Sequence, residues 1–448
     1  MYNLLKKATL ASFVLLFACN EPEKSNPNFQ QEAANPEFLH RSLKQLTSVI
    51  KHDLFGPMIA ARIYAYAHVA MYEALIPNTS EYKSLAGQVK GLNPLPQPEA
   101  GKTYCYPLAS VKAYLRVGKK LIFSEDSIAQ FEAKMLQDFK KIGIPKDVWE
   151  RSIAFGDTIG GSIIAWSGKD NYLQTRSAPK YTVTFDNPKR WRPTAPDYAD
   201  AAEPHWNKIR SLTLDSASQF KPIRPTPFDT NTNSLFYKQA FEVAKSVADS
   251  TPERIAIARY WDDSPMATQN AGHVNFVIKK VTPGGHWMHI TEAVCRQQKT
   301  AAVKAAAAYV QTAIAIFDGF ISCWDEKYRS EVIRPETYIT KYIKGKQDWT
   351  PILVTPPFPE YPSGHSVISG AASTVLNHFF GDTLSFTDDT EVQFNLGTKT
   401  FSSFHAAADE AAMSRMYGGI HYMPAIQIGV EQGRNVGKHI VSKIKLNF

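Results

Sequence analysis

The sequence predicts an all-α fold of two helical bundles joined by a long irregular connection. Apolar residues recur at helical spacing over most of the 448 residues, which is the pattern of amphipathic helices. The stretch 168–232 breaks that pattern, and an alanine-rich stretch at 300–322 has the composition of a buried core helix. We therefore divide the folded chain into an N-terminal helical region with its long loop, 37–232, and a C-terminal bundle, 233–448.

The N-terminus has the pattern of an export signal. Two lysines precede an apolar run at 8–18 that is too short to span a bilayer. The string 16–19 resembles a bacterial lipobox, so we expect 1–19 to be a lipoprotein signal peptide and Cys19 to be lipidated. A bulky residue in that string leaves open a plain signal peptide cut elsewhere. Residues 20–36 have the composition of a flexible tether, and we expect an outer-membrane lipoprotein on the periplasmic or cell-surface side.

The N-terminal half is predicted to be helical up to about residue 166. A segment at 37–75 carries leucine and isoleucine at helical spacing, and Pro57 interrupts it because proline lacks the amide hydrogen of a helix interior. Further helices are expected at 126–141 and 145–166. The stretch 168–232 contains eight prolines and several aromatic residues, which indicates a packed segment over the mouth of the pocket rather than a disordered linker.

Helical periodicity resumes in the C-terminal half. The first helix is expected at 234–248, and a second at 252–260 opens with Thr251 as a cap and proline in its first turn. Another helix follows the Pro-Gly-Gly-His-Trp string at 283–287. The core helix at 300–322 leads directly into a segment with basic residues.

Charge and cysteine content exclude several classes of protein. Formal net charge is +8, but the basic residues are scattered without a stripe or a recognisable module, so we expect no nucleic-acid partner and a general attraction of small anions. Beyond Cys19 the cysteines are Cys105, Cys295 and Cys323, widely spaced and without a Cys-x-x-Cys string. They predict neither a disulfide framework nor a zinc site, and structural thiols are the favoured interpretation.

The most informative stretch is the proline-rich string 356–365, which ends in Ser363-Gly364-His365 before a run of small apolar residues. A helix that starts there exposes unpaired backbone N–H groups beside a hydroxyl and an imidazole, which is a cradle for an oxyanion. His365 is placed to exchange a proton with a bound anion or with a second substrate.

A second basic cluster lies just before this string. Lys327 and Arg334 are seven residues apart, so both cations point the same way if the segment is helical. Trp324 lies three residues before Lys327 and shares that face.

The third cluster is formed by Arg415 and His421. Their six-residue spacing separates them on an unbroken helix, but Gly418 and Gly419 are a natural helix end, so the chain can turn and bring both side chains to one site. Together the three clusters provide guanidinium, ammonium, hydroxyl and amide donors for a compact anion with several oxygens.

Two further groups of polar residues are candidates for this site. Asp262 and Asp263 are candidates for a carboxylate behind a buried arginine of the anion site, and surface positions are equally compatible with the sequence. His286 and His289 have the spacing of metal ligands but lack a third candidate nearby, so a structural pair is favoured.

The three spaced clusters resemble the type 2 phosphatidic acid phosphatase and vanadium haloperoxidase superfamily. The resemblance rests on three motifs and covers the C-terminal half. The first is a lysine followed, after six residues, by Arg-Pro; the second is Pro-Ser-Gly-His; and the third is Ser-Arg followed, after five residues, by a histidine. It implies a vanadium chloroperoxidase-like fold and vanadate as cofactor, with phosphate as the competing occupant. The implied roles are oxyanion contacts for Lys327, Arg334, Arg415, Ser363 and Gly364, an acid–base group at His365, the vanadium ligand at His421, and a halide pocket walled by Trp324 and Phe358.

The superfamily contains two chemistries, and the sequence favours the haloperoxidase. The chain is long, Trp324 and Phe358 match halide-pocket positions, and the stretch 282–287 is similar to bacterial haloperoxidase-like proteins. The resemblance then implies hydrogen peroxide and a halide as substrates, iodide first and bromide second, with small organic acceptors. The alternatives are an acid or lipid phosphatase acting through a phosphohistidine, and a non-catalytic glycan-binding surface lipoprotein.

One position departs from the family pattern. Many relatives carry an aspartate four residues after the vanadate histidine, and this sequence has Ala425 there. We expect either a less basic His421 or a backbone carbonyl as the partner of its second ring nitrogen.

Overall fold

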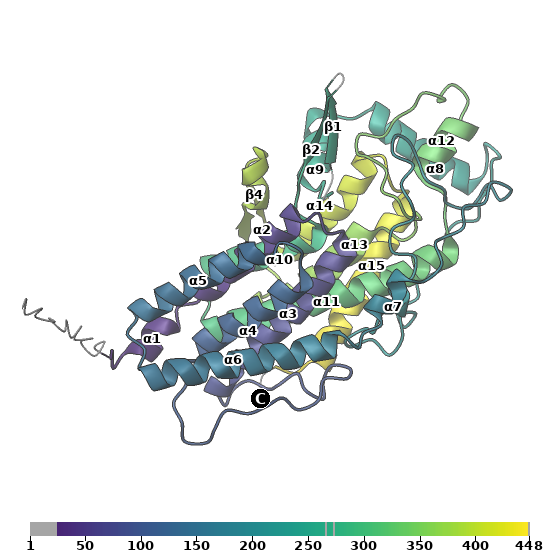
Figure 1. Ribbon diagram of the computed structural model, residues 1–448. Helices are drawn as coiled ribbons and strands as arrows, with labels where there is room; N and C mark the ends of the chain where they lie inside the picture. The colour runs from purple at the N-terminus through teal and green to yellow at the C-terminus, as the bar shows by residue number, and fades with distance from the viewer. Residues whose placement is uncertain (1–24, 265–266, 272–273, 447–448) are drawn as a thin grey trace, which may run out of the picture.

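The computed structural model describes residues 25–264, 267–271 and 274–446, and most of them are helical, as predicted. The predicted signal peptide, including Cys19, lies outside the described residues. The predicted tether ends too late, because Phe29 and Ala33 are already buried in the core. The helices of the N-terminal half are α1 (Phe29–Ala33), α2 (Glu37–His52), α3 (Pro57–Leu75), α4 (Tyr106–Leu121), α5 (Glu125–Lys141) and α6 (Lys146–Ser167) (Figure 1).

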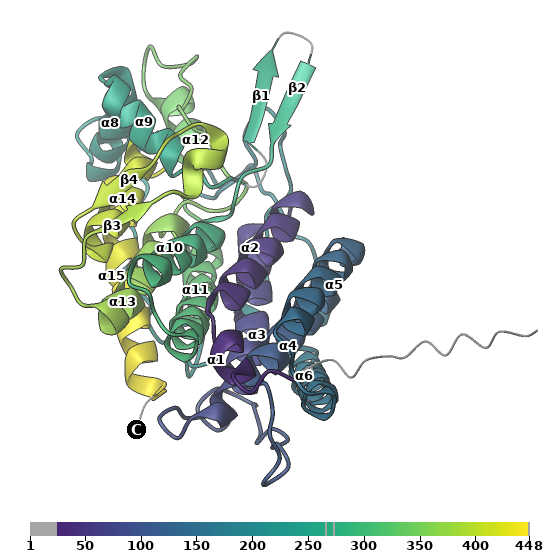
Figure 2. The same ribbon diagram turned by 90° about the vertical axis from the view of Figure 1, so that its left-hand side faces the viewer.

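The C-terminal half packs beside the N-terminal helices, as Figure 2 shows. The helices expected at 234–248 and 252–260 are present, and the helix expected after 287 already begins at Pro283, so the Pro-Gly-Gly-His-Trp string forms its first turns. Cys105, Cys295 and Cys323 are free and buried. The helices of this half are α8 (Leu235–Ala248), α9 (Pro252–Tyr260), α10 (Pro283–Gln297), α11 (Ala302–Ser330), α12 (Pro335–Tyr342), α13 (Gly364–Phe380), α14 (Phe404–Tyr417) and α15 (Met423–Lys443).

Helix α11 is the core of the molecule and packs against both α3 and α13. It is long and apolar enough to cross a membrane, but the apolar part of it is entirely buried inside the protein. The alanine-rich composition explains this place, because small side chains let neighbouring helices approach from every side. The helix runs eight residues beyond the predicted end and carries Trp324 and Lys327 in its last turns.

The irregular connection predicted at 168–232 is irregular in the structure, apart from α7 (Tyr172–Arg176) and a short 3-10 turn, η2 (Trp206–Lys208). It is packed rather than disordered. Trp206 is fully buried, and the backbone N–H groups of Leu212 and Thr213 each donate to the buried Asp318 of α11 at 2.7 Å.

Two short antiparallel strand pairs were not predicted. Strands β1 (Ala267–Ala271) and β2 (Val274–Ile278) pair with Ala267 opposite Ile278 and project from the bundle (Figure 2). Strands β3 (Phe386–Asp388) and β4 (Lys399–Phe401) pair with Phe386 opposite Phe401, and a 3-10 turn, η3 (Thr390–Phe394), lies between them. Strands of three to five residues carry too little alternation for a sequence pattern to distinguish them from loops.

Glycines let α13 and α15 approach closely enough for backbone contact. A Cβ atom at Gly433 would lie 2.1 Å from the carbonyl oxygen of Val367, and one at Gly370 would lie 2.6 Å from that of Val430. This contact also anchors the N-terminus of α13, because the N–H of Ser363 donates to the carbonyl of Ala425 in α15 at 3.0 Å.

We expect Gly433→Val to destabilise the fold by about 2 kcal/mol or more, because overpacking at a rigid backbone contact forces the helices apart. The measurement is the denaturant midpoint of unfolding. Gly161→Ala in α6 is the control, since its Cβ would meet only the guanidinium end of the Arg116 side chain, at 3.4 Å. Equal midpoints for the Gly433 variant and the wild type would contradict the close packing.

Candidate active site

The predicted oxyanion cradle is present at the start of α13. Ser363 is the N-terminal cap of the helix, and its hydroxyl accepts a hydrogen bond from the N–H of Ser366 at 3.3 Å. Gly364 is the first helical residue, and a Cβ there would lie 3.5 Å from the ring of Trp324. The sequence cue of a small polar cap before a helix therefore placed this element correctly.

Lys327 and Arg334 do converge, but the predicted reason is wrong. Helix α11 ends at Ser330, Glu331 has a left-handed backbone with φ of 50°, and Arg334 is the extended residue before Pro335 of α12. Proline disfavours helical geometry at the residue before it, so a single helix through both cations could not form. The two side chains meet because the chain folds back, not because they share a helix face.

Lys327 lies under the proline-rich string. Its ammonium group is fully buried and donates to the carbonyl oxygens of Pro359, Glu360 and Pro362 at 2.9, 3.1 and 2.5 Å. Burial lowers the pKa of Lys327 to about 7, with the nearby Arg334 adding to the effect. The lysine thus ties the backbone of this string to α11 and places a positive charge beneath it.

Arg334 and His421 face each other in the buried site. The guanidinium donates from Nε to the carbonyl of Phe358 at 2.9 Å and from Nη1 to the carbonyl of Ile420 at 2.9 Å. Nη1 also lies 3.1 Å from Nε2 of His421. The remaining nitrogen, Nη2, is buried and has no hydrogen-bond partner in the part of the chain that the structure describes.

His421 lies in the turn between α14 and α15. Gly418 ends α14, Gly419 has a positive φ of 78°, and the N–H of Ile420 donates back to the carbonyl of Arg415 at 3.2 Å. The predicted glycine turn therefore brings Arg415 and His421 to one site, as expected for a left-handed helix end.

Glu360 is the carboxylate behind His421, and it was missed from sequence. Its Oε1 accepts from Nδ1 of His421 at 2.8 Å and from the backbone N–H of Tyr422 at 2.9 Å. The expectation of a backbone carbonyl partner, drawn from Ala425, is wrong. The available cue was an acid in an otherwise apolar, proline-rich string, because a buried charge needs a polar partner.

This pairing fixes the tautomer of His421. Nη1 of Arg334 can only donate, so Nε2 of His421 faces it with its lone pair, and the hydrogen of the neutral ring lies on Nδ1, which donates to Oε1 of Glu360. Burial, followed by the charges of Arg334 and Lys327, holds the pKa of His421 well below its usual range. Burial also raises the pKa of Glu360 to about 7. The site thus presents a neutral imidazole nitrogen beside two cations.

His365 faces Asp263. Its Nε2 lies 3.4 Å from Oδ2 of Asp263, an ion-pair distance without hydrogen-bond geometry, and 18% of its side chain is exposed. Burial, then the charge of Arg415, lowers the pKa of His365 to about 4, so the ring is neutral near neutral pH.

The structure corrects the expectation that a carboxylate hydrogen-bonds the arginine of the anion site. The guanidinium of Arg415 donates to Oγ of Ser414 and to the carbonyl oxygens of Ala258 and Trp261. Asp263 is buried and turns to His365 and His286, whereas Asp262 is half-buried near the charges of Lys280 and Arg415, and burial raises its pKa.

The two predicted halide-pocket residues are neighbours. The ring centroids of Trp324 and Phe358 are 4.9 Å apart. The Phe358 ring also lies 5.0 Å from both Nζ of Lys327 and Cζ of Arg334. The indole N–H of Trp324 donates at 3.2 Å to the carbonyl of Ala202, which belongs to the long connection, so that connection covers this side of the site.

Comparison with known proteins decides the family. A search of curated protein sequences found no match. The model of the VCPO second helical-bundle domain matches residues 307–448. A crystal structure of a bacterial vanadium-dependent iodoperoxidase is 46% identical and superposes with a TM-score of 0.87, over 92% of this chain and 98% of that one. The chain belongs to the vanadium-dependent haloperoxidases.

More distant haloperoxidases share the fold. Crystal structures of holo-type and apo-type bacterial vanadium-dependent chloroperoxidase are 17% and 16% identical, with TM-scores of 0.66 and 0.67. Each match covers 87% of this chain, and 93% and 95% of the other chain respectively. The predicted fold and the predicted choice of haloperoxidase over phosphatase or glycan-binding lipoprotein are confirmed by the family assignment.

The haloperoxidase has a donor set that fits vanadate. Nη2 of Arg334 is a buried nitrogen that has no hydrogen-bond partner among the described residues, and it belongs to a residue of the site. Unpaired buried donors are costly unless a ligand satisfies them. The cations and the neutral Nε2 of His421 complete a set suited to a tetrahedral oxyanion with one coordination position for nitrogen.

Proposed function

We propose that this haloperoxidase uses hydrogen peroxide to oxidise iodide, with bromide a poorer substrate, at a vanadate bound to Nε2 of His421. The observation that carries the site is the pairing of His421 Nδ1 with Glu360, which leaves Nε2 as a lone-pair donor beside Arg334. The iodide preference is supported by the 46% identity to a bacterial iodoperoxidase.

Bound vanadate would supply a Lewis acid that activates peroxide without a change of oxidation state. We propose that Arg334 and Arg415 neutralise its oxygens and that Ser363 and Gly364 donate from the helix start. Lys327 would act mainly through its charge, because all three of its N–H groups already meet carbonyl oxygens.

His365 would be the acid–base group of the reaction. Its low pKa leaves the ring neutral, so it can accept a proton from hydrogen peroxide as the peroxide binds and return it to a leaving oxygen. Partial exposure of the side chain gives the proton a route to solvent.

Trp324 and Phe358 would form the halide side of the site. Their rings lie against the cations Lys327 and Arg334, so a halide there meets polarisable surface and positive charge together. Iodide is more polarisable and more easily oxidised than bromide or chloride, so its oxidation requires the least oxidising power from the site.

The test is triiodide formation by vanadium-stripped protein with peroxide and iodide, before and after orthovanadate is added. We expect activity only with vanadate, progressive inhibition by phosphate, and a lower kcat/KM with bromide. Equal or greater turnover of bromide or chloride would overturn the iodide preference. Hydrolysis of a phosphomonoester without vanadate-dependent turnover would overturn the function itself.

We also propose that the enzyme is exported and anchored by lipid at Cys19, on the strength of the lipobox-like string at 16–19. Labelling of growing cells with a palmitate analogue should mark the wild type and not Cys19→Ser. Equal labelling of both would refute the anchor.

A further inference from the structure

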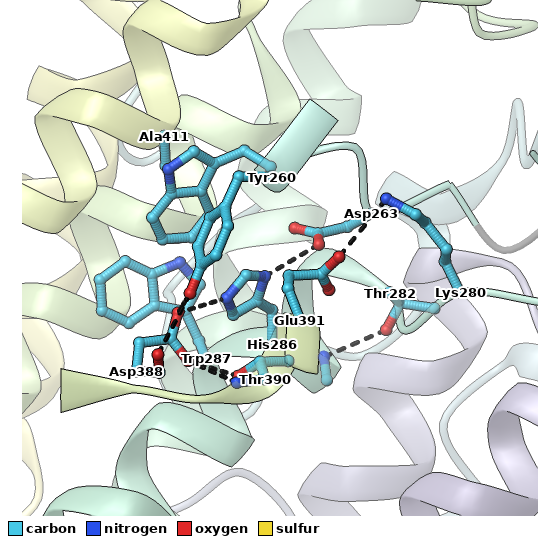
Figure 3. Close-up of polar contacts among 12 residues, drawn as sticks. Tyr260, Asp263, Lys280, Thr282, His286, Trp287, Asp388, Thr390, Glu391 and Ala411 are labelled. Atoms are coloured by element: carbon cyan, nitrogen blue, oxygen red, sulfur yellow. Dashed lines mark hydrogen bonds and ion pairs between the residues drawn. The ribbon is translucent and has the colours of Figure 1, made fainter. Parts of the chain in front are cut away.

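A buried chain of alternating carboxylates and imidazoles leads away from His365. Asp263, which faces His365, also accepts at Oδ1 from Nδ1 of His286 at 2.9 Å. Nε2 of the same ring lies 2.8 Å from Oδ2 of Asp388, in β3. Figure 3 shows the ring of His286 between the two carboxylates. None of the three side chains is more than 2% exposed.

The contacts around Asp388 show which atoms carry hydrogens. Its carboxylate also receives Oη–H of Tyr260 at 2.8 Å, and Oγ1–H and N–H of Thr390 at 2.6 and 3.0 Å. A carboxylate that accepts from so many donors is ionised, so Nε2 of His286 must donate to it. Nδ1 equally needs a hydrogen to bond Asp263.

Both ring nitrogens of His286 therefore carry hydrogens, and the ring is an imidazolium. The indole of Trp261 stacks on it with a centroid distance of 4.5 Å and an interplanar angle of 20°, a geometry in which an aromatic face stabilises a cation. The two carboxylates raise the pKa of His286 well above its usual range, although burial alone would lower it.

We propose that His286 is a permanently charged positioning residue: clamped between Asp388 and Asp263, it fixes the carboxylate that faces His365 and limits how strongly that carboxylate attracts a proton to His365. The inference rests on the proposed acid–base role of His365. The charge on His286 partly offsets the charge on Asp263, so His365 stays a neutral base.

A divalent cation is the competing explanation of this cluster. Ligand atoms of Asp263, His286 and Glu391 lie within 4.8 Å of one another. However, Nζ of Lys280 is 3.4 Å from Glu391, and both nitrogens of His286 face carboxylates. A metal would have to displace the ammonium and deprotonate the imidazole, so the contacts favour the imidazolium.

The ionisable groups that face the two histidines come from every neighbouring element. They are Tyr260 of α9, Asp262 and Asp263 after it, Lys280 before α10, Asp388 of β3, Glu391 of η3, Arg415 of α14 and His421. Asp388 hydrogen-bonds His286 directly and, among the described residues, makes no contact with His365, so it is the position at which to change the charge on His286.

Asp388→Asn is the decisive variant. The oxygen of the new amide can still accept the hydrogen bonds from Thr390, and its nitrogen can donate to Nε2 of His286. His286 can therefore lose one proton without a loss of packing. Its positive charge then no longer lowers the pKa of His365, while Asp263 keeps its hydrogen bond from Nδ1. The pKa of His365 should rise by about one unit.

The primary readout is histidine ¹⁵N NMR of the full-length, vanadium-free protein between pH 5 and 9, with resonances assigned from His286→Gln and His365→Gln. We expect His286 to stay doubly protonated throughout in the wild type. In Asp388→Asn it should lose a proton within that range, and the midpoint of His365 should rise. Asp389→Asn is the control, because Asp389 pairs with His289 at 2.9 Å on the surface.

In the vanadate-loaded enzyme, the midpoint of the acid limb in the pH profile of kcat/KM for iodide should shift to higher pH by about the same amount, because His365 must be neutral to accept a proton. A merely structural role would lower kcat at every pH without moving this limb. A singly protonated His286 in the wild type, a stoichiometric divalent metal at the cluster, or unchanged midpoints in Asp388→Asn would overturn the inference. The expected NMR result without turnover in any form would refute the proposed function and leave the clamp established.

Discussion

His421→Ala is expected to abolish vanadate-dependent iodide oxidation. His421 is the proposed vanadium ligand, because Glu360 holds the hydrogen on Nδ1 and leaves Nε2 with a lone pair beside Arg334. Residues behind a metal ligand already contribute about 10- to 100-fold to metal affinity, so loss of the ligand itself should cost more than about 100-fold. The measurements are equilibrium dialysis of orthovanadate and triiodide formation at saturating vanadate.

His405→Ala is the matched control for that variant. His405 is partly buried in α14, and its Nδ1 lies 3.1 Å from Oγ of Ser373, so its removal also deletes one imidazole contact inside the protein. Similar unfolding midpoints with activity lost only in the His421 variant would support the ligand role. Full turnover by His421→Ala would refute it.

Above pH 7, where Glu360 is ionised, Glu360→Gln should lower vanadate affinity by about 10- to 100-fold while the protein stays folded. The amide oxygen can still accept from His421 and Tyr422, so the tautomer is retained and only the negative charge that makes His421 a better donor is lost. The affinity is measured by the same dialysis, and the loss should appear in vanadate binding more than in kcat at saturating vanadate.

Glu73→Gln provides the comparison. Glu73 of α3 is also buried, accepts from the N–H of Leu85 at 2.6 Å and from Oγ of Ser84 at 2.8 Å, and burial raises its pKa to about 7, as at Glu360. It lies in the N-terminal bundle, so its substitution tests the cost of removing such a carboxylate alone. Equal vanadate affinity in both variants would show that Glu360 has no special effect on His421.

Local pattern predicted most of the helical fold. The break at Pro57, the cap at Ser363 and the helix end at Gly418 each depend on a few neighbouring residues, whose backbone preferences act before any tertiary contact forms. The two strand pairs were missed because their short segments have no periodicity of their own.

The sequence predicted which residues form the candidate site, but not which hydrogen-bond partners they have. Motif spacing correctly predicted that the basic residues and histidines share one site. It wrongly placed Lys327 and Arg334 on one helix and wrongly paired the aspartates with an arginine. In the structure Lys327 donates to three carbonyls of the proline-rich string, and Asp263 serves two histidines.

By itself the sequence determined the helices, the oxyanion cradle and the family resemblance, because these follow from local periodicity and fixed spacing. Only the tertiary structure decided that Glu360 sets the tautomer of His421 and that Asp388 and Asp263 clamp His286. Glu360 lies 61 residues from His421 in the sequence, and Asp388 and Asp263 lie 102 and 23 residues from His286. Such contacts arise when α10, α13, α14 and β3 pack around one core, and buried charges then choose the partners that the packing provides.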